Sequence, residues 1–408
     1  MTRPRLLRAL TAVTAAACLV PGATAQAAVS SPSGPAIRAQ AAALSSGDWA
    51  QATLPADYYL SDTPVPVSCV PGTKFCVALP LDSAVIFPSF AVGQAALVST
   101  TAGKSWTGYA TLPTGLALTG LSCVSSTVCW ASGTGPTGKP AVAETTDGAQ
   151  TWTDMSPASW ATATWWPHSI DCVSASTCWL AGEDDAHGVA PALVETTDGG
   201  ATWTQLSNLP TITQYDPNGT YQLSGISCVS GSSCVAVGGL NESDGKAVAI
   251  ATADGGSSWT LSSDPTLLKS QDLFGVSCLT TAGGTVRCVA AADALAAAGP
   301  VTLVSPDGGT TWGHRQRFDT TGWFSSVACA SVQRCWVAGA GTSVALAGTL
   351  DGGTSWSTVS SDTTDQEGSV SCLNRQVCVA AVDNALWVTQ DDGGLTAATA
   401  ASSAASHG

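Results

Sequence analysis

Cysteine is the residue type with the most regular chemistry in the sequence. Fourteen of the 15 cysteines form seven close pairs: Cys69/Cys76, Cys123/Cys129, Cys172/Cys178, Cys228/Cys234, Cys278/Cys288, Cys329/Cys335 and Cys372/Cys378. Structural zinc sites favour two to four residues between paired cysteines, and these pairs have five or more between them. The even set therefore predicts a local disulfide within each pair and no metal or cofactor.

A second set of polar residues surrounds a repeated aspartate. The stretch TTDGGATWT, Thr196–Thr204, has near copies that begin at Thr145, Thr252, Ser305 and Thr349. A catalytic carboxylate would occur once, whereas an aspartate needed in every copy can hold a turn by accepting backbone hydrogen bonds. We expect this structural role for Asp147, Asp198, Asp254, Asp307, Asp351 and Asp391.

Candidate ligand-binding residues lie in the variable segments between the repeated motifs. They are Trp160, Trp165, Trp166, His168, Tyr215, Tyr221 and Trp323. Exposed aromatic side chains on one face of a rigid scaffold are typical of ligand stacking, for example on sugar rings. The alternative is that these rings pack over the ends of strands. The acidic stretch 183–187, EDDAH, is interpreted as a solvated turn rather than a metal loop.

Recognisable catalytic motifs are absent, so we expect no catalytic residues. The sequence has no nucleophile elbow, no Walker loop and no His-Glu-x-x-His. Arg287, Arg334 and Arg375 lie within or beside the cysteine pairs, where they could not converge on one substrate carboxylate as a sialidase requires. Asp171 stands before the first cysteine of its pair, where five copies have serine and one has alanine. It has no evident carboxylate partner, although a glycoside hydrolase remains the alternative.

These residues belong to a repeat of short β-rich segments. In the fourth copy GISCV and CVAVG predict a hairpin, AVAIAT a third strand and SWTLS a fourth. The unit returns every 43 to 56 residues, measured between first cysteines. Seven units of four antiparallel strands predict an all-β fold, a seven-bladed β-propeller.

The repeated turn resembles the Asp-box, or BNR repeat, of sialidase-like propellers, Ser/Thr-x-Asp-x-Gly-x-Thr-Trp. Ala149 replaces the glycine in one copy, and Thr101 stands in place of the aspartate in the first. The whole unit is similar to propellers of the photosystem II assembly and stability factor family and of the sortilin and xyloglucanase types. Those proteins do different things, so the resemblance implies the fold and leaves the function open.

The ends of the sequence predict how the ring closes. The last repeat lacks an outer strand, and SGDWAQATLP, residues 46–55, resembles the outer strand of the first blade, KSWTGYATLP. We expect a strand around Trp49 to complete the last blade. The propeller would span residues 46–395, followed by a disordered Ala/Ser-rich tail, 396–408.

The N-terminus predicts export. Arg3, Arg5 and Arg8 precede the apolar run ALTAVTAAACLV, as in a secretory signal peptide of residues 1–27. Residues 28–45 would be a linker, and a lipid anchor at Cys18 is the alternative. The net charge of −15, without a basic stripe, argues against nucleic acid and anionic membranes as partners.

Together these features predict a secreted monomer without a membrane span. It would bind a glycan or an extracellular protein, without catalysis, through the face formed by the inter-blade loops. The alternatives are an Asp-box glycoside hydrolase and an assembly or stability factor for an extracytoplasmic complex.

Overall fold

The computed structural model describes residues 49–55, 60, 65–80, 95–185, 190–212, 220–240, 246–267, 272–292, 299–319, 322–341, 344–359, 367–382 and 384–389. The predicted signal peptide, linker and tail lie outside these residues. So do Tyr215, His187 and Asp391.

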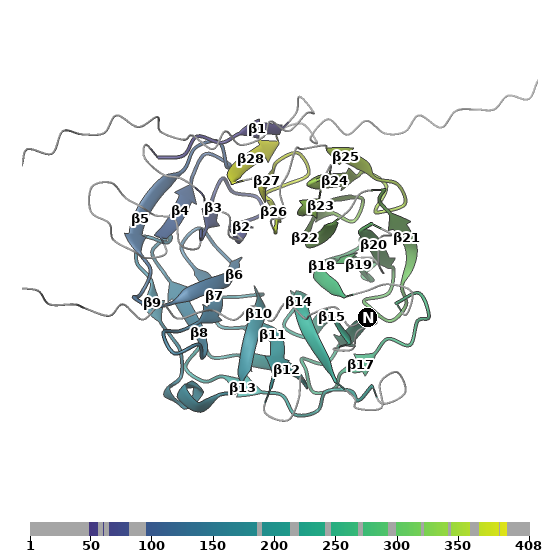
Figure 1. The fold of residues 1–408 in the computed structure, drawn as a ribbon, viewed down its shortest axis with the longest axis horizontal. Coiled ribbons are helices and arrows are strands. Elements are labelled where there is room, and N and C mark those ends of the chain that lie inside the picture. The colour runs from purple at the N-terminus through teal and green to yellow at the C-terminus, as the bar shows by residue number, and fades with distance from the viewer. Residues whose placement is uncertain are drawn as a thin grey trace, which may run out of the picture. The chain divides into compact units, whose positions relative to one another are not determined.

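Seven four-stranded antiparallel sheets form a ring, which confirms the predicted seven-bladed β-propeller (Figure 1). Blade 1 contains β2 (Val67–Cys69), β3 (Cys76–Ala78), β4 (Ala95–Ser99) and β5 (Thr107–Thr111). Blade 2 contains β6 (Ala117–Cys123), β7 (Cys129–Thr134), β8 (Pro140–Thr145) and β9 (Thr153–Asp154). Blade 3 contains β10 (Trp165–Cys172), β11 (Cys178–Asp184), β12 (Ala190–Thr196) and β13 (Thr204–Gln205). A short 3-10 helix, η1 (Ala158–Thr162), precedes blade 3.

The remaining blades repeat this order from the centre outward. Blade 4 contains β14 (Tyr221–Ser230), β15 (Ser233–Leu240), β16 (Ala247–Thr252) and β17 (Thr260–Leu261). Blade 5 contains β18 (Leu273–Thr280), β19 (Val286–Ala292), β20 (Val301–Ser305) and β21 (Gly313–Arg317). Blade 6 contains β22 (Gly322–Ser331), β23 (Arg334–Gly341), β24 (Leu346–Thr349) and β25 (Ser357–Val359). Blade 7 contains β26 (Ser369–Cys372), β27 (Cys378–Val382), β28 (Ala385–Thr389) and the N-terminal β1 (Trp49–Gln51).

The hydrophobic core lies between the blades. In β15, Val235 and Val237 pack against blade 5, whereas Ala236 packs against blade 3. Side chains of a strand alternate between the two faces of its sheet, and here a neighbouring blade covers each face. The middle strands are therefore continuous apolar runs. In the described part of the chain, seven buried clusters each span one blade interface.

All seven predicted cysteine pairs form disulfides between the first two strands of their blades. The bonds are Cys69–Cys76, Cys123–Cys129, Cys172–Cys178, Cys228–Cys234, Cys278–Cys288, Cys329–Cys335 and Cys372–Cys378. The paired Cα atoms lie 4.0 Å apart, or 4.1 Å in blade 5. This short distance identifies a non-hydrogen-bonded pair, in which the N–H of each residue points away from the partner strand. Each disulfide closes a short hairpin and stabilises its blade by about 2 kcal/mol.

The second cysteine of each disulfide lies in the core between blades. These seven side chains are at most 1% exposed: Cys76, Cys129, Cys178, Cys234, Cys288, Cys335 and Cys378. They belong to the second strands, whose faces are covered by neighbouring blades. The predicted pairing is confirmed, and the spacing of the cysteines gave no sign of this burial. Each disulfide also contributes apolar packing to a blade interface.

Each Asp-box carboxylate holds its own turn. In blade 3 the Asp198 Oδ1 atom accepts hydrogen bonds from the Thr202 N–H at 2.9 Å and the Thr196 hydroxyl at 2.9 Å. The Thr202 hydroxyl donates to Oδ2 at 2.7 Å, and the Gly200 N–H donates to the Thr196 hydroxyl at 2.9 Å. The bonds from Thr202 lower the pKa of Asp198.

The second glycine of the Asp-box lies against the preceding blade. Gly200 has φ +78°, and a Cβ atom there would lie 2.5 Å from Cη2 of Trp130 in blade 2. Ala149 occupies the same position in blade 2 with φ +64° and is fully buried. The close approach therefore explains the glycine as much as the turn conformation does.

Tryptophan pairs join three of the blade interfaces. Trp130 meets Trp203 at a centroid distance of 5.9 Å, and Trp179 meets Trp259 at 6.1 Å, both edge to face. In each pair a tryptophan after the second cysteine contacts the Asp-box tryptophan of the next blade. Trp336 makes the corresponding contact with Trp49 at 4.9 Å.

The N-terminal strand closes the ring as predicted. Trp49 pairs with Thr389 of β28, and the Ala52 N–H donates to the Leu386 carbonyl at 2.8 Å. The next residue, Thr53, then exchanges backbone hydrogen bonds of 2.9 Å with the Lys104 carbonyl and the Trp106 N–H of blade 1. One short segment thus contacts blade 6 through Trp336 and ties blade 7 to blade 1.

Candidate binding surface on the upper face

The two faces of the ring are built from different parts of the repeat. The Gly148 N–H of an Asp-box donates to the Thr127 carbonyl of the cysteine hairpin in the same blade at 3.0 Å. The corresponding bond joins Gly199 to Ser176 in blade 3. We call the face of hairpins and Asp-boxes the lower face. The opposite, upper face carries the inter-blade segments and the loops between second and third strands.

Trp160, Trp165 and Tyr221 are buried, so the expectation that they present exposed rings is wrong. Trp160 and Trp165 are 7% and 3% exposed and form an edge-to-face pair at 4.9 Å. Trp160 also contacts Trp203 at 5.8 Å. Tyr221 is 1% exposed and donates its hydroxyl to the Pro210 carbonyl at 3.0 Å. These rings pack over the ends of strands, which was the alternative considered for them. They thereby anchor η1 and the inter-blade segments.

Trp166, His168 and Glu183 form a partly exposed row at the upper end of blade 3, which we call the blade 3 rim. Trp166 pairs with Glu183 across β10 and β11, and His168, at a β-bulge between Pro167 and Ser169, reaches the same glutamate. His168 Nε2 lies 3.6 Å from Glu183 Oε1, and these two side chains are 31% and 23% exposed.

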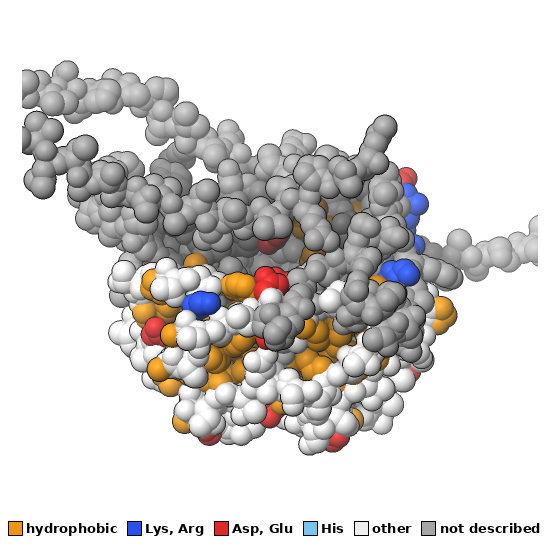
Figure 2. All heavy atoms as spheres, turned by 60° about the horizontal axis from the view of Figure 1, so that its bottom comes forward, with side chains coloured by type: hydrophobic (Ala, Val, Ile, Leu, Met, Phe, Trp, Pro, Cys, Tyr) orange, Lys and Arg blue, Asp and Glu red, His pale blue; other side chains and the backbone are white. Residues whose placement is uncertain are grey.

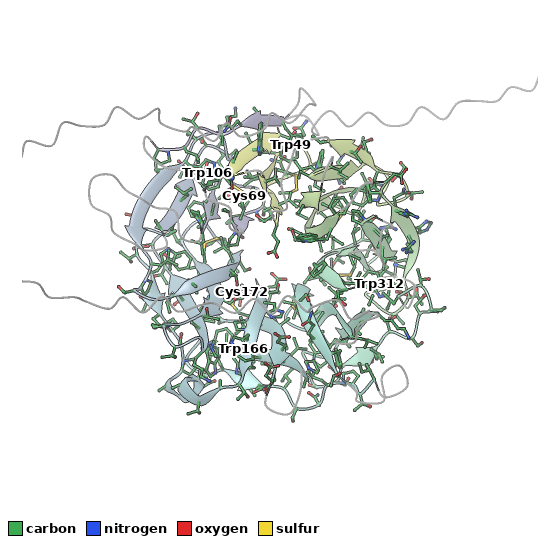
Figure 3. All side chains as sticks on the ribbon, in the orientation of Figure 1. Trp49, Cys69, Trp106, Trp166, Cys172 and Trp312 are labelled. Carbon is green, nitrogen blue, oxygen red and sulfur yellow. A yellow bond between two sulfur atoms is a disulfide. The ribbon has the colours of Figure 1, made fainter. Side chains whose placement is uncertain are left out.

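The indole of the rim is held in place by the neighbouring blade. Trp166 Nε1 donates to the Gly138 carbonyl in the loop between β7 and β8 at 2.9 Å. Beside Gly138, Lys139 Nζ donates to the Ala163 carbonyl ahead of β10 at 2.7 Å. Trp166 lies farther from the ring centre than Cys172, at the opposite end of the same strand (Figure 3). The rim therefore lies at the junction of blades 2 and 3.

Acidic side chains extend the blade 3 rim. Asp184 accepts hydrogen bonds from the Thr164 hydroxyl at 2.7 Å and from Gln205 Nε2 at 3.3 Å. Burial and the nearby charges of Glu183 and Asp184 raise the pKa of Asp185. The sequence interpretation of 183–187 as a turn missed that β11 continues to Asp184, which brings Glu183 beside Trp166 and His168.

The other candidates are placed as follows. Trp323 is partly exposed in β22 of blade 6, and Tyr215 lies outside the described residues. Within the described part of the chain, no group of three or more His, Cys, Asp or Glu residues is arranged to hold a metal ion. In Figure 2, where the bottom edge of the view in Figure 1 comes forward, charged side chains are few among apolar and uncharged ones, and several Lys or Arg side chains lie close together at the right edge.

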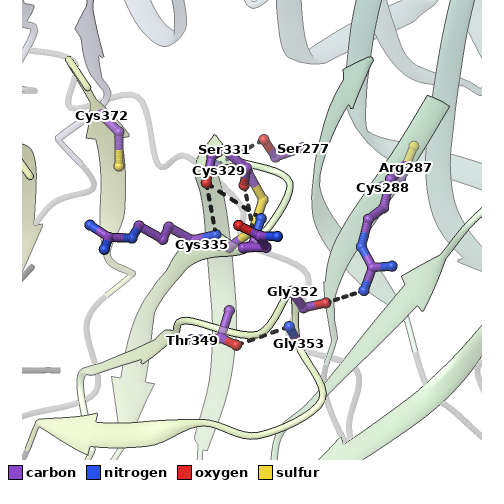
Figure 4. Close-up of a disulfide and its surroundings, with 12 residues drawn as sticks. Ser277, Arg287, Cys288, Cys329, Ser331, Cys335, Thr349, Gly352, Gly353 and Cys372 are labelled. Atoms are coloured by element: carbon purple, nitrogen blue, oxygen red, sulfur yellow. Dashed lines mark hydrogen bonds between the residues drawn. A yellow bond between two sulfur atoms is a disulfide. The ribbon is translucent and has the colours of Figure 1, made fainter. Parts of the chain in front are cut away.

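Two of the arginines considered for sialidase chemistry link blades on the lower face, and Figure 4 shows Arg287 beside Gly352. The Arg287 guanidinium of blade 5 donates to the Gly352 carbonyl of blade 6. Arg334 of blade 6 donates to the Arg375 carbonyl of blade 7 at 3.2 Å. Their inter-blade role was not visible in the sequence, because the partners are backbone atoms of the next repeat.

Asp171 is also engaged in contacts between blades. Its Oδ2 atom accepts the Cys228 N–H of blade 4 at 2.7 Å, and its Oδ1 atom accepts the Ser122 hydroxyl of blade 2 at 3.4 Å. Burial raises the pKa of Asp171 to about 6, against the opposing effect of hydrogen bonds from Cys228, Cys172 and Ser122. The groups that contact this carboxylate are thus structural donors rather than a second carboxylate.

Comparisons with known proteins identify the fold. No protein-family model and no curated protein matches the chain. A structure of YCF48 bound to D1 peptide is 14% identical and covers 86% of this chain and 99% of its own, with a TM-score of 0.56. YCF48 from Cyanidioschyzon merolae is 13% identical and covers 85% of this chain and 100% of its own, with a TM-score of 0.55. The chain is an Asp-box β-propeller in fold. A Hadza microbial sialidase, 12% identical, covers 82% of this chain and 66% of its own, with a TM-score of 0.42.

Among the described residues, no helix has the length and apolar character needed to cross a lipid bilayer.

Proposed function

We propose that the protein is an exported, non-catalytic propeller that binds an extended segment of another polypeptide at the blade 3 rim. The single observation that carries this proposal is the arrangement of Trp166, His168 and Glu183 on paired strands of the upper face. An indole, an imidazole and a carboxylate in one partly exposed row can offer apolar contact, hydrogen bonding and charge to one ligand.

The rim is preorganised for binding. Trp166 is fixed by its bond to the Gly138 carbonyl, and β10 and β11 are joined below it by the Cys172–Cys178 disulfide. Because few protein groups would have to become ordered on binding, the loss of conformational entropy would be small, which favours affinity. Tryptophan is enriched among residues that dominate protein interfaces.

A polypeptide ligand is favoured over a glycan by two observations. Burial of Trp160, Trp165 and Tyr221 removes three of the six candidate tryptophan and tyrosine rings on which sugar rings could stack. In addition, one of the two YCF48 structures is of a complex with a peptide. At 14% identity this likeness supports the choice of ligand class only as an analogy.

Export is supported by the disulfides. Seven disulfides in one propeller are typical of oxidising compartments and rare in reducing ones. We infer that the protein functions outside the cytosol, where its partner would also be found.

The proposal can be tested by selecting random peptides of about 12 residues on the oxidised protein and measuring Kd for the enriched sequences. Trp166→Ala and Glu183→Gln are each expected to weaken binding about tenfold or more, the range of an interface hot spot. Lys104→Ala, an exposed lower-face change in blade 1, is the control and should leave Kd unchanged. Thermal melting of each variant checks that the ring remains folded.

Three outcomes would overturn the proposal. Enriched peptides could bind all four proteins equally, which would place their site elsewhere. A glycan array could instead give ligands that depend on Trp166, which would replace the ligand class. Finally, wild-type protein could cleave a polysaccharide and lose this activity on Asp171→Asn or Glu183→Gln, which would make it a glycoside hydrolase.

A further inference from the structure

The indole of Trp166 presents an aromatic surface without a free polar group. Tryptophan has a single hydrogen-bonding group, the Nε1–H donor, and in Trp166 this donor is bonded to the Gly138 carbonyl at 2.9 Å. The ring is nevertheless partly exposed, so its carbon surface is accessible to a ligand. The face of an aromatic ring carries partial negative charge and attracts cations, and the indole does so more strongly than the rings of tyrosine or phenylalanine.

Glu183 places a carboxylate beside this ring. It lies directly opposite Trp166 in the antiparallel pair of β10 and β11, so the two side chains are neighbours on one side of the sheet. In the described part of the chain no group donates a hydrogen bond to this carboxylate, and His168 Nε2 lies 3.6 Å from Oε1. Glu183 can therefore accept hydrogen bonds from a ligand without losing one within the protein.

The charges around the rim are mostly negative. Asp184 ends β11 and Asp185 follows it, so three carboxylates stand in succession. Beside them, the ammonium of Lys139 is bonded to the Ala163 carbonyl at 2.7 Å. Three carboxylates against one ammonium leave the rim negative even when His168 is protonated. The net charge of −15 on the whole chain attracts cations in the same way at longer range.

Arginine fits this arrangement better than lysine does. Its guanidinium group is flat and weakly hydrated, so it can stack on an indole while the N–H groups at its edge donate to a carboxylate. A lysine ammonium is a compact, strongly hydrated charge and gains less from an aromatic face. A ring and a carboxylate side by side on paired strands offer both of the contacts that a guanidinium can make at once.

We propose that the blade 3 rim recognises an arginine side chain of the polypeptide that it binds, with the guanidinium stacked on the Trp166 indole and paired with the Glu183 carboxylate. This inference rests on the proposed function and names the residue of the partner that the site selects. The Cys172–Cys178 disulfide joins β10 and β11 below the rim, so the ring and the carboxylate are held together before the ligand arrives.

Three peptide libraries test the preference. Each presents peptides of about 12 residues to the oxidised protein. The central residue is fixed as arginine, lysine or glutamate, and the other positions contain neither arginine nor lysine. We expect the arginine library to yield the most peptides whose binding is lost on Trp166→Ala, the lysine library to yield fewer, and the glutamate library to yield none.

Citrulline in place of the central arginine then measures the contribution of the charge, because it keeps the shape of the side chain and removes only the cation. In an enriched peptide this replacement should weaken binding to the wild type about tenfold, through loss of the ring contact and of the ion pair. On Glu183→Gln the same replacement should cost only about threefold, since the ring contact alone remains to be lost. Asp319→Asn removes the same charge from an exposed position in blade 5 and should leave the tenfold effect unchanged.

The outcomes separate this inference from the proposed function. Trp166-dependent peptides that come equally from the glutamate library would leave polypeptide binding intact and overturn the choice of arginine. A citrulline effect of the same size on the wild type and Glu183→Gln would overturn the pairing with Glu183. Absence of Trp166-dependent binding in all three libraries would overturn the proposed function and this inference together.

Discussion

At the scale of the residue, contacts with the preceding repeat decide which substitutions the Asp-box accepts. The second glycine of the box in blade 3, Gly200, combines a left-handed conformation with a close approach to Trp130 of blade 2. An isolated turn would require only the left-handed conformation. The tryptophan after the second cysteine therefore restricts a residue about 70 positions later in the chain.

Gly200→Ala separates these two effects. A methyl group there would strain the backbone and collide with the Trp130 ring, so we expect the free energy of unfolding to fall by about 2–4 kcal/mol. Gly284→Ala is the matched control: Gly284 has φ +83° with no atom within 4 Å of the added Cβ, and its cost should be about 1 kcal/mol. Equal losses in urea denaturation would show that the inter-blade contact is unimportant.

At the scale of the element, β1 has only three residues, yet it stabilises contacts among three blades. Trp49 is 4% exposed, packs edge to face on Trp336 of blade 6 and begins the outer strand of blade 7. Outer-ring tryptophans such as Trp49, Trp106 and Trp312 are visible in Figure 3. Because Thr53 then bonds to blade 1, a loss at this strand loosens three blades together.

Trp49→Ala should accordingly destabilise the whole propeller. Removing a buried tryptophan is expected to lower the free energy of unfolding by about 3–5 kcal/mol. Trp166→Ala, at a partly exposed position, should shift the thermal midpoint little by comparison. If the two changes lowered the midpoint equally, ring closure would not depend on the Trp49 contact.

Sequence patterns predicted the elements well, since each blade repeats its own local signals. The seven hairpins and the Asp-box turns could be read from residues within one unit, and the closing strand from the likeness of residues 46–55 to the outer strand of blade 1. Contacts between units could not be predicted in this way. Asp171 and Cys228 are one repeat apart, and burial of Trp165 depends on η1 and Trp160. Periodicity also gave no sign that β11 extends to Asp184, because the acidic stretch resembles a turn.

At the scale of the whole molecule, stability is distributed over seven blade interfaces and its pH dependence has two sources of opposite sign. The pKa values of Asp147, Asp198, Asp254, Asp307 and Asp351 are lowered, so their contribution is present above about pH 3.8 and is lost as the pH falls below it. The pKa of Asp171 is raised to about 6, and burial also raises the pKa values of Glu144, Asp185 and Glu195. The contributions of these four groups are present at low pH and are lost as the pH rises, for Asp171 through about 6.

These groups together should give a thermal midpoint that is highest near about pH 4 and falls toward neutral pH. Asp171→Ser removes a carboxyl whose pKa is raised, so it should change the free energy of unfolding more favourably at pH 7 than at pH 4. Scanning calorimetry of both proteins across this range isolates the Asp171 contribution as their difference. A difference that does not vary with pH would contradict the assignment.

The hairpin disulfides also govern how the native pairing is found. Fourteen cysteines allow about 135,000 complete pairings by the usual count, yet every native partner lies 6 to 10 positions along the chain. Loops of that length close in about 10–100 ns, far faster than contacts between repeats are made. Each pair can therefore be oxidised as soon as its hairpin exists. A mispaired cysteine finds its native partner within the same hairpin and not in a distant blade. Reduced, unfolded protein should regain its seven bonds with an oxidant alone, and an added disulfide isomerase should raise neither the rate nor the yield more than about twofold.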